Sequence, residues 1–477
     1  MQHTTIRFVH ASDLHLERPV GGLSEAPDHL RQILVDAPYL AAQRVFDCAV
    51  AEAVDFVILA GDVVDAARAG ARAVAFLDEQ FRRLAHHGIS VYWAGGNAEQ
   101  SEQLADMPQA WPNVHLFPAG RVERIVHRRG DTPVASVLGT SRRKGQPVRL
   151  DQFCAEPDGL PSIGVLYGCP PAPAVLRSGL CYLALGGRHQ RGQLPMAKQT
   201  PTVSSGPKGQ RRRAVQSENQ DHRGKPSRNV KTQLVNAQCA TAHRPGVLAH
   251  FPGTPQGRCA EHPGPYGCTL VEIDGQRTHS RFVPTDAVRW IDARLTIDAT
   301  TTRQRLEELL RQEVQAMRES APALDLLICW RISGNGQLAG QLRCDPLAEE
   351  LLAWLRREFG YGPPACWSVS IQTEPHRSAL AKASEEQTVL GDLLRALQQL
   401  HQNPQQPLEL ESMVDRRLLP PKVFQLLCKP GPRRRAQLLE EAAQLAMKLL
   451  GAEPTGAEPT GAEGTGAEAA SAEAASA

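Results

Sequence analysis

Apolar segments and segments with helical spacing alternate through the first hundred residues of the chain. Three segments have the apolar, β-rich composition of buried strands: 6–12, 56–60 and 89–94. Two segments between these strands carry apolar side chains at helical spacing: 39–53 and 72–87. This order of strand, helix, strand, helix and strand predicts a parallel sheet covered by helices, which is an α/β fold.

Further strands follow, and then the composition changes. Short strands with turn residues between them are expected over 114–140, and two apolar strands follow at 163–166 and 182–185. Residues 190–246 are rich in Gln, Ser, Pro, Gly, Arg and Lys and contain no Phe, Trp or Tyr. Because such a segment cannot bury enough apolar surface to fold, we predict a disordered basic insertion.

The chain is predicted to contain four regions: a first domain over 1–290, an α+β capping domain over 291–375, a helical region over 376–450 and a disordered tail over 451–477. The capping domain includes a short strand predicted at 340–343. In the helical region, amphipathic spacing predicts three helices: 384–399, 408–418 and 435–450. The tail is a near-repeat of small and polar residues, which cannot form a core.

Net charge and cysteine content indicate which partners and which cellular compartment to expect for the protein. The 477 residues carry a formal net charge of +2, so any affinity for nucleic acid must come from local patches such as 198–231. The alternative for that patch is incidental charge on a surface insertion. The eleven cysteines show no C-x-x-C spacing, which fits reduced thiols better than a disulfide framework. We find no signal peptide or membrane-spanning segment and expect a cytoplasmic protein.

Polar residues follow each of the first three predicted strands. Asp13 and His15 come after the first, Asp62 after the second and Asn97 after the third. Because parallel strands end at the same edge of a sheet, these side chains are expected to meet there. Carboxylate, imidazole and amide groups are ligands for divalent metal ions, so the pattern predicts the site of a two-metal phosphoesterase.

The order of these motifs is more specific than any one of them. D-x-H, G-D-x-x-D, G-N and a G-x-x-H that ends at His189 occur in that order, and Pro-Gly-Thr-Pro-Gln-Gly-Arg follows at 252–258. Together they resemble the calcineurin-like metallophosphoesterases, and among them the SbcD/YhaO type of DNA repair exonuclease, over roughly residues 6–290. The resemblance implies a four-layer α/β/β/α sandwich, followed by the small capping domain and C-terminal helices.

The resemblance also implies a ligand set for two Mn²⁺ ions. The first ion would be held by four residues that are all present: Asp13, His15, Asp62 and His189. The second would use Asp62 as a bridge, Asn97 and two histidines. Two cations about 3.5–4 Å apart need a shared carboxylate to offset their repulsion, and together they activate a water and neutralise phosphoryl oxygens.

Three positions depart from the family pattern. The two histidines of the second site are replaced by Tyr167 and Gly187, and the histidine that would protonate the leaving oxygen is replaced by Ala98. General acid catalysis typically contributes about 10²–10⁴ in rate, so we expect weakened activity. We assign catalytic roles to Asp62, Asn97 and Arg188, with Asn97 positioning phosphate or a loosely held second ion.

Several residues could compensate for these losses. Tyr167 could bind a metal as a phenolate, although its ordinary pKa near 10 makes that costly. Arg188 could replace part of the missing charge at a phosphate. A histidine could act as a replacement ligand: His250, or the pair His86 and His87.

Two functions of different classes remain open at this point. The first is a metal-dependent hydrolase, a phosphodiesterase or DNA exonuclease. The second is a catalytically silent DNA-repair scaffold that binds DNA or an ATPase. The expected partners are DNA, an SbcC-type ATPase, which the resemblance implies, and a second copy of the chain, with no membrane.

Overall fold

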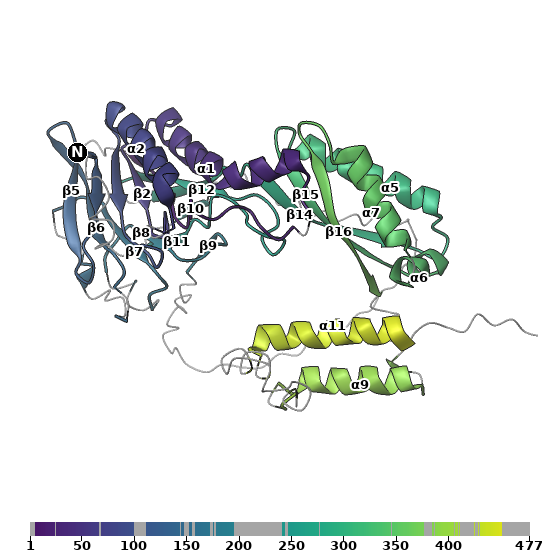
Figure 1. The fold of residues 1–477 in the computed structure, drawn as a ribbon. Helices are drawn as coiled ribbons and strands as arrows, with labels where there is room; N and C mark the ends of the chain where they lie inside the picture. Colours follow the sequence, from purple (N-terminus) through teal and green to yellow (C-terminus); the bar gives the residue numbers. More distant parts are fainter. Residues whose placement is uncertain are drawn as a thin grey trace, which may run out of the picture. The chain divides into compact units, whose positions relative to one another are not determined.

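The computed structural model describes residues 5–99, 111–194, 241–375, 384–410 and 424–450, apart from short gaps within these ranges. The centre of the predicted insertion, 195–240, lies outside the described residues, as do the tail 451–477 and most of the helix predicted at 408–418. The described residues form two large sheets, a smaller sheet and seven helices (Figure 1).

The first sheet contains the predicted parallel strands. Its seven strands have the order β10-β13-β12-β1-β2-β3-β4. Their bounds are β1 (Ile6–Ala11), β2 (Phe56–Leu59), β3 (Ser90–Trp93), β4 (Val114–Leu116), β10 (Thr241–His243), β12 (Gly267–Asp274) and β13 (Arg277–Pro284). Strands β1 to β4 are parallel, whereas β12 pairs antiparallel with β1. The loops after β1, β2 and β3 therefore lie at one edge of this sheet.

The second sheet has six strands in the order β5-β6-β7-β8-β11-β9. Their bounds are β5 (Glu123–Arg129), β6 (Thr132–Thr140), β7 (Ser162–Tyr167), β8 (Tyr182–Gly186), β9 (Gly192–Gln193) and β11 (Leu248–Phe251). Strands β6, β7, β8 and β11 are parallel to one another. Strands β9 and β10 lie at the two margins of the predicted insertion.

Apolar side chains fill three layers of the core. Helices α1 (Asp28–Ala51) and α2 (Gly70–His86) pack on one face of the first sheet, with Phe46 and Phe81 in that layer. Phe8 and Tyr182 lie between the two sheets. Phe153, from a connecting segment, covers the outer face of the second sheet. The predicted α/β sandwich is confirmed.

Helix α1 begins at Asp28, eleven residues before the predicted start at 39, and runs through Pro38. A proline inside a helix removes a hydrogen bond and usually ends the element, which hid this part of the helix in the sequence pattern. Leu30 and Leu34 are buried in a cluster with Trp290, and this packing accounts for the extra turns.

A three-stranded sheet follows, formed by β14 (Val288–Ile297), β15 (Asp325–Gly334) and β16 (Cys366–Pro375). The accompanying helices are α5 (Arg303–Ser320), α6 (Gln337–Cys344) and α7 (Leu347–Phe359). The strand predicted at 340–343 is wrong, because these residues belong to α6. Leu338, Ala339 and Leu342 are buried at helical spacing. A segment of four residues is too short to distinguish the 3.6-residue period of a helix from the two-residue alternation of a strand.

Contacts between Cα atoms divide the chain into two compact units. One comprises 1–295, 303–332 and 348–372, and the other comprises 296–302, 333–347 and 373–477. In the second unit, helices α9 (Val389–Gln402) and α11 (Pro432–Leu450) share a small apolar cluster. The predicted domain boundaries stay predictions. Within the described part of the chain, no helix is both long and apolar enough to cross a bilayer.

Candidate metal centre

The loops after β1 and β2 hold three residues in an unusual backbone conformation. Asp13, His15 and Asp62 have φ angles of 55°, 43° and 51°, in the left-handed region that residues other than glycine rarely adopt. The amide of Asp13 donates to the carbonyl of Gly61 at 2.9 Å, and the amide of His15 donates to the carbonyl of Asp62 at 2.9 Å. Because these bonds continue the pairing of β1 with β2, the sheet holds the strained backbone and aims the side chains.

Asp13 is fully buried and keeps one carboxylate oxygen without a partner. Its Oδ2 accepts hydrogen bonds from Ser12 Oγ at 2.6 Å and from the amide of Gly187 at 3.0 Å, whereas Oδ1 has no hydrogen bond with any described residue. Burial raises the pKa of Asp13 to about 6, although these two hydrogen bonds act to lower it. An unpartnered carboxylate oxygen in the interior is costly unless it binds a cation.

Two histidines face this carboxylate. Ligand atoms of Asp13, His15 and His189 all lie within 4.8 Å of one another. His15 is buried, and within the part of the chain that the structure describes neither of its ring nitrogens forms a hydrogen bond. Burial, with His15 and Arg258 nearby, lowers the pKa of His189 to about 4, so this imidazole is neutral near pH 7 and able to bind a metal. The unpartnered atoms of this group fit a divalent cation.

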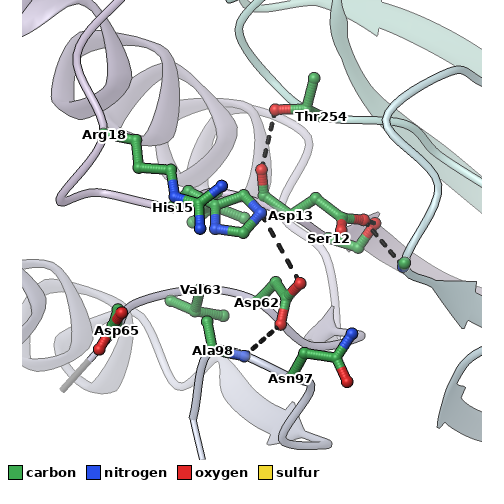
Figure 2. A network of polar contacts seen from close by, with 12 residues as sticks. Ser12, Asp13, His15, Arg18, Asp62, Val63, Asp65, Asn97, Ala98 and Thr254 are labelled. Atoms are coloured by element: carbon green, nitrogen blue, oxygen red, sulfur yellow. Dashed lines mark hydrogen bonds and ion pairs between the residues drawn. The ribbon is translucent and has the colours of Figure 1, made fainter. Parts of the chain in front are cut away.

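Asp62 lies at the margin of this group (Figure 2). Its Oδ2 is 3.7 Å from His15 Nε2, and the Asp62 carboxylate does not belong to the close group of three. Oδ1 accepts a hydrogen bond from the amide of Ala98 at 2.7 Å, and Oδ2 accepts one from the Tyr167 hydroxyl at 2.6 Å. The predicted bridging carboxylate is thus tied to the loop after β3 and to the end of β7.

The predicted second-site residues are bonded to one another. Asn97 is exposed, and its Nδ2 donates to the Tyr167 hydroxyl at 3.0 Å. Burial and the Asp62 carboxylate raise the pKa of Tyr167 above its ordinary value. A hydroxyl that donates to a carboxylate and has a raised pKa is a neutral phenol, which opposes the phenolate-ligand hypothesis. The residues around Asn97 do not fit a second cation.

The other predicted compensating residues lie elsewhere. Arg188 is exposed, and its guanidinium carbon lies 5.0 Å from the centre of the Phe251 ring. His250 is buried between the sheets, where its Nε2 lies 2.9 Å from Thr269 Oγ1. His86 and His87 are exposed at the end of α2, before β3, whereas Asn97 follows β3. His250 is therefore not a metal ligand, and the catalytic role of Arg188 stays a prediction.

Three residues at the site were missed from the sequence. Glu17 Oε1 lies 3.5 Å from His15 Nδ1 and can orient that ring. Glu99 is buried, accepts hydrogen bonds from the Val63 amide and the Trp93 indole, and has a pKa raised to about 8 by burial. Arg258 donates to the carbonyl of Leu14 at 2.6 Å.

The signal for these three residues was weak. Glu17 and Glu99 stand two residues after a recognised motif residue, a spacing that carries no chemistry by itself. Arg258 ends the segment 252–258, which was recognised, and the structure shows what that segment does. Thr254 donates to the carbonyl of Asp13 at 2.8 Å, so the segment supports the backbone of the metal loop.

Comparisons with known proteins agree with this geometry in part. Residues 6–150 match the family described as calcineurin-like phosphoesterase, a span that includes Asp13, His15, Asp62 and Asn97 but not His189. The uncharacterized metallophosphoesterase YhaO of Bacillus subtilis (strain 168) is 33% identical over 205 residues, which are 39% of this chain. The match spans 50% of that relative's length.

Among solved structures, this chain is similar to a dimetal phosphatase from Danio rerio, with 9% identity and a TM-score of 0.30. That match covers 58% of this chain and 97% of the phosphatase. The sequence match and the cluster of Asp13, His15 and His189 lead to the same assignment. The N-terminal part of the chain carries a calcineurin-like metallophosphoesterase domain, of a class of hydrolases that bind divalent metal ions.

Proposed function

We propose that this chain is a metal-dependent phosphoesterase that hydrolyses phosphodiester bonds, with DNA as its substrate and Mn²⁺ as its metal ion. The observation that carries the proposal is the group of buried Asp13 and His15 with partly buried His189, whose ligand atoms all lie within 4.8 Å of one another. Among the described residues, Asp13 Oδ1 and both ring nitrogens of His15 have no hydrogen-bond partner, and buried polar atoms of this kind have no evident structural use without a cation. SbcD/YhaO-type exonuclease activity is the finer form of the proposal.

Asp13, His15 and His189 would hold the ion, with Asp62 beside them. When bound, a divalent cation would polarise a phosphoryl oxygen and lower the pKa of a water. Glu17 orients His15 through its Nδ1. The amide of Asn97 has a second N–H that can donate to a phosphoryl oxygen, because Asn97 is exposed and, among the described residues, its nitrogen donates to Tyr167 alone.

The chain offers no proton donor where the family histidine would stand. Ala98 has no ionisable group, and its amide is bonded to Asp62. Water would then have to protonate the leaving oxygen, so we expect slow turnover. Loss of a general acid typically costs about 10²–10⁴ in rate.

A small cavity beside the site is lined by cationic side chains, which favours an anionic substrate. It has a volume of about 50 Å³ and is lined by ten residues, none of them acidic, including Arg142, Arg143 and Tyr167. The guanidinium carbon of Arg142 lies 5.6 Å from the centre of the Tyr167 ring. No acidic residue lines this cavity among the residues that the structure describes. Two such cations can bind a phosphate next to the one at the metal.

The test is Mn²⁺-dependent cleavage of an end-labelled linear duplex by the purified chain. Asp13→Asn keeps the shape of the side chain and removes its charge, and Asp28→Asn, at an exposed position of α1, is the matched control. We expect cleavage by the parent and by the control and loss of cleavage in Asp13→Asn. Equal cleavage by all three proteins would refute the assignment of the site.

The second candidate is a catalytically silent scaffold that binds DNA or an ATPase of the SbcC type. Ala98, in place of a proton donor, is the observation that favours it. No cleavage by a parent protein that still binds Mn²⁺ and duplex DNA would support this candidate. A homodimer and a cytoplasmic location are further parts of the proposal, which sedimentation and cell fractionation would test.

A further inference from the structure

The Tyr167 hydroxyl lies between the two residues that would remain of a second metal site. It donates to Asp62 Oδ2 at 2.6 Å and accepts from Asn97 Nδ2 at 3.0 Å. The hydroxyl therefore uses the carboxylate oxygen and the amide that a cation at this position would need.

The ring of Tyr167 is enclosed by backbone. A Cβ atom added to Gly61 would lie 2.4 Å from its Cδ2, and one added to Gly96 would lie 2.8 Å from the same atom. A Cβ at Gly187 would lie 2.9 Å from Tyr167 Cζ. Real Cβ atoms do not approach so closely, so the three glycines make room for this ring. Tyr167 is only 6% exposed, and the backbone of these glycines borders its ring.

The remaining ligand set is too small for a cation. Mn²⁺ favours octahedral coordination by oxygen and nitrogen atoms, and here it would have Asp62, the Asn97 amide and a neutral phenol. To enter, it would also have to break the hydrogen bond that the Tyr167 hydroxyl donates to Asp62 Oδ2. Since Oδ2 already accepts that bond, the carboxylate gains less from a second ion than a free carboxylate would.

We propose that Tyr167 replaces a second cation, so that the site binds one metal ion per chain, at Asp13, His15 and His189. The hydroxyl fixes Asp62 and Asn97, and the ring closes the space beside them. Tyr167 is thus a positioning residue. The inference concerns the metal site of the proposed function, but a metal count needs no substrate, so a failure of the hydrolase proposal would leave it standing.

The experiment counts Mn²⁺ per chain by equilibrium dialysis at saturating Mn²⁺, with electron paramagnetic resonance as the second readout. We expect a count of one in the parent, with the signal of an isolated ion. Tyr167→His adds an imidazole beside Asp62 and Asn97, so the count rises to two and the signal shows coupled ions. Tyr167→Phe keeps the ring and adds no ligand, so its count stays at one.

Three results would overturn the proposal. A count of two in the parent would show that the tyrosine admits a second ion. A count of two in Tyr167→Phe would show that the ring does not close the space. A count of one in a Tyr167→His variant with the parent's circular dichroism spectrum would show that something other than Tyr167 excludes the second ion.

Discussion

Removal of the Tyr167 hydroxyl should destabilise the metal-free protein more than removal of an equally buried hydroxyl with a neutral partner. In Tyr167→Phe, Asp62 Oδ2 loses a hydrogen bond of 2.6 Å while remaining nearly buried. Hydrogen bonds to charged groups contribute about 1.5–3 kcal/mol, against about 0.5–1.5 kcal/mol for neutral pairs. For a domain of this size, the larger loss corresponds to a fall in Tm of about 3–12 °C.

The matched control is Tyr92→Phe. The Tyr92 hydroxyl is also buried, and it lies 2.9 Å from His127 Nδ1, a partner that is neutral because burial lowers the pKa of His127. Differential scanning fluorimetry of the two variants without metal gives the comparison. Saturating Mn²⁺ should reduce the difference, because a cation near Asp62 compensates part of its charge.

A fall in Tm for Tyr167→Phe that is no larger than that for Tyr92→Phe would refute this reasoning. It would mean that Asp62 finds water or another donor when the phenol is removed. The same result would weaken the view of Tyr167 as the group that fixes this carboxylate.

Three further predictions concern other parts of the domain. Burial and the nearby His250 hold the pKa of His10 well below its ordinary value, so only the unfolded state gains a proton at mildly acidic pH. The stability from the neutral His10 is therefore present above about pH 6.5 and is lost below it, by up to about 1.4 kcal/mol per pH unit. Urea midpoints at pH 7.5 and 5.5 will measure this loss. A midpoint that does not fall would contradict the buried neutral state. Arg142→Ala and Arg143→Ala should each weaken duplex binding and reduce the slope of log affinity against log salt concentration by about 1, which titrations at several salt concentrations will measure. An unchanged slope would mean that these arginines do not contact DNA phosphates. Asp13→Asn should lower Mn²⁺ affinity by at least about tenfold in equilibrium dialysis, and an affinity equal to that of Asp28→Asn would exclude Asp13 as a ligand.

The sequence predicted the sheets and the meeting of the first ligands because both follow from chain topology. Apolar segments of strand length located β1, β2 and β3, and parallel strands carry the residues after them to one edge. His189 was identified 174 residues beyond His15 by its place after another buried strand. Residue type and strand order were sufficient for these positions.

The sequence could not predict how the polar atoms would pair. Tyr167 was recognised as a departure from a pattern, but its bonds to Asp62 and Asn97 depend on side-chain directions and on the room that glycines leave. Glu17 and Glu99 were missed for the same reason, since their partners are set by the fold. The exclusion of His250 depends on which face of β11 it occupies, which a four-residue strand does not reveal.

At Asp13, His15 and Asp62 the backbone is left-handed, so the residues that provide metal ligands also lower the stability of the fold. For residues other than glycine this conformation costs roughly 1–2 kcal/mol per position, and glycine would remove that cost. Glycine would also remove the ligand. Because the carboxylates of Asp13 and Asp62 accept hydrogen bonds that glycine would also remove, a selection for heat resistance alone would favour glycine first at His15, whereas a selection that also demands bound metal would keep that histidine.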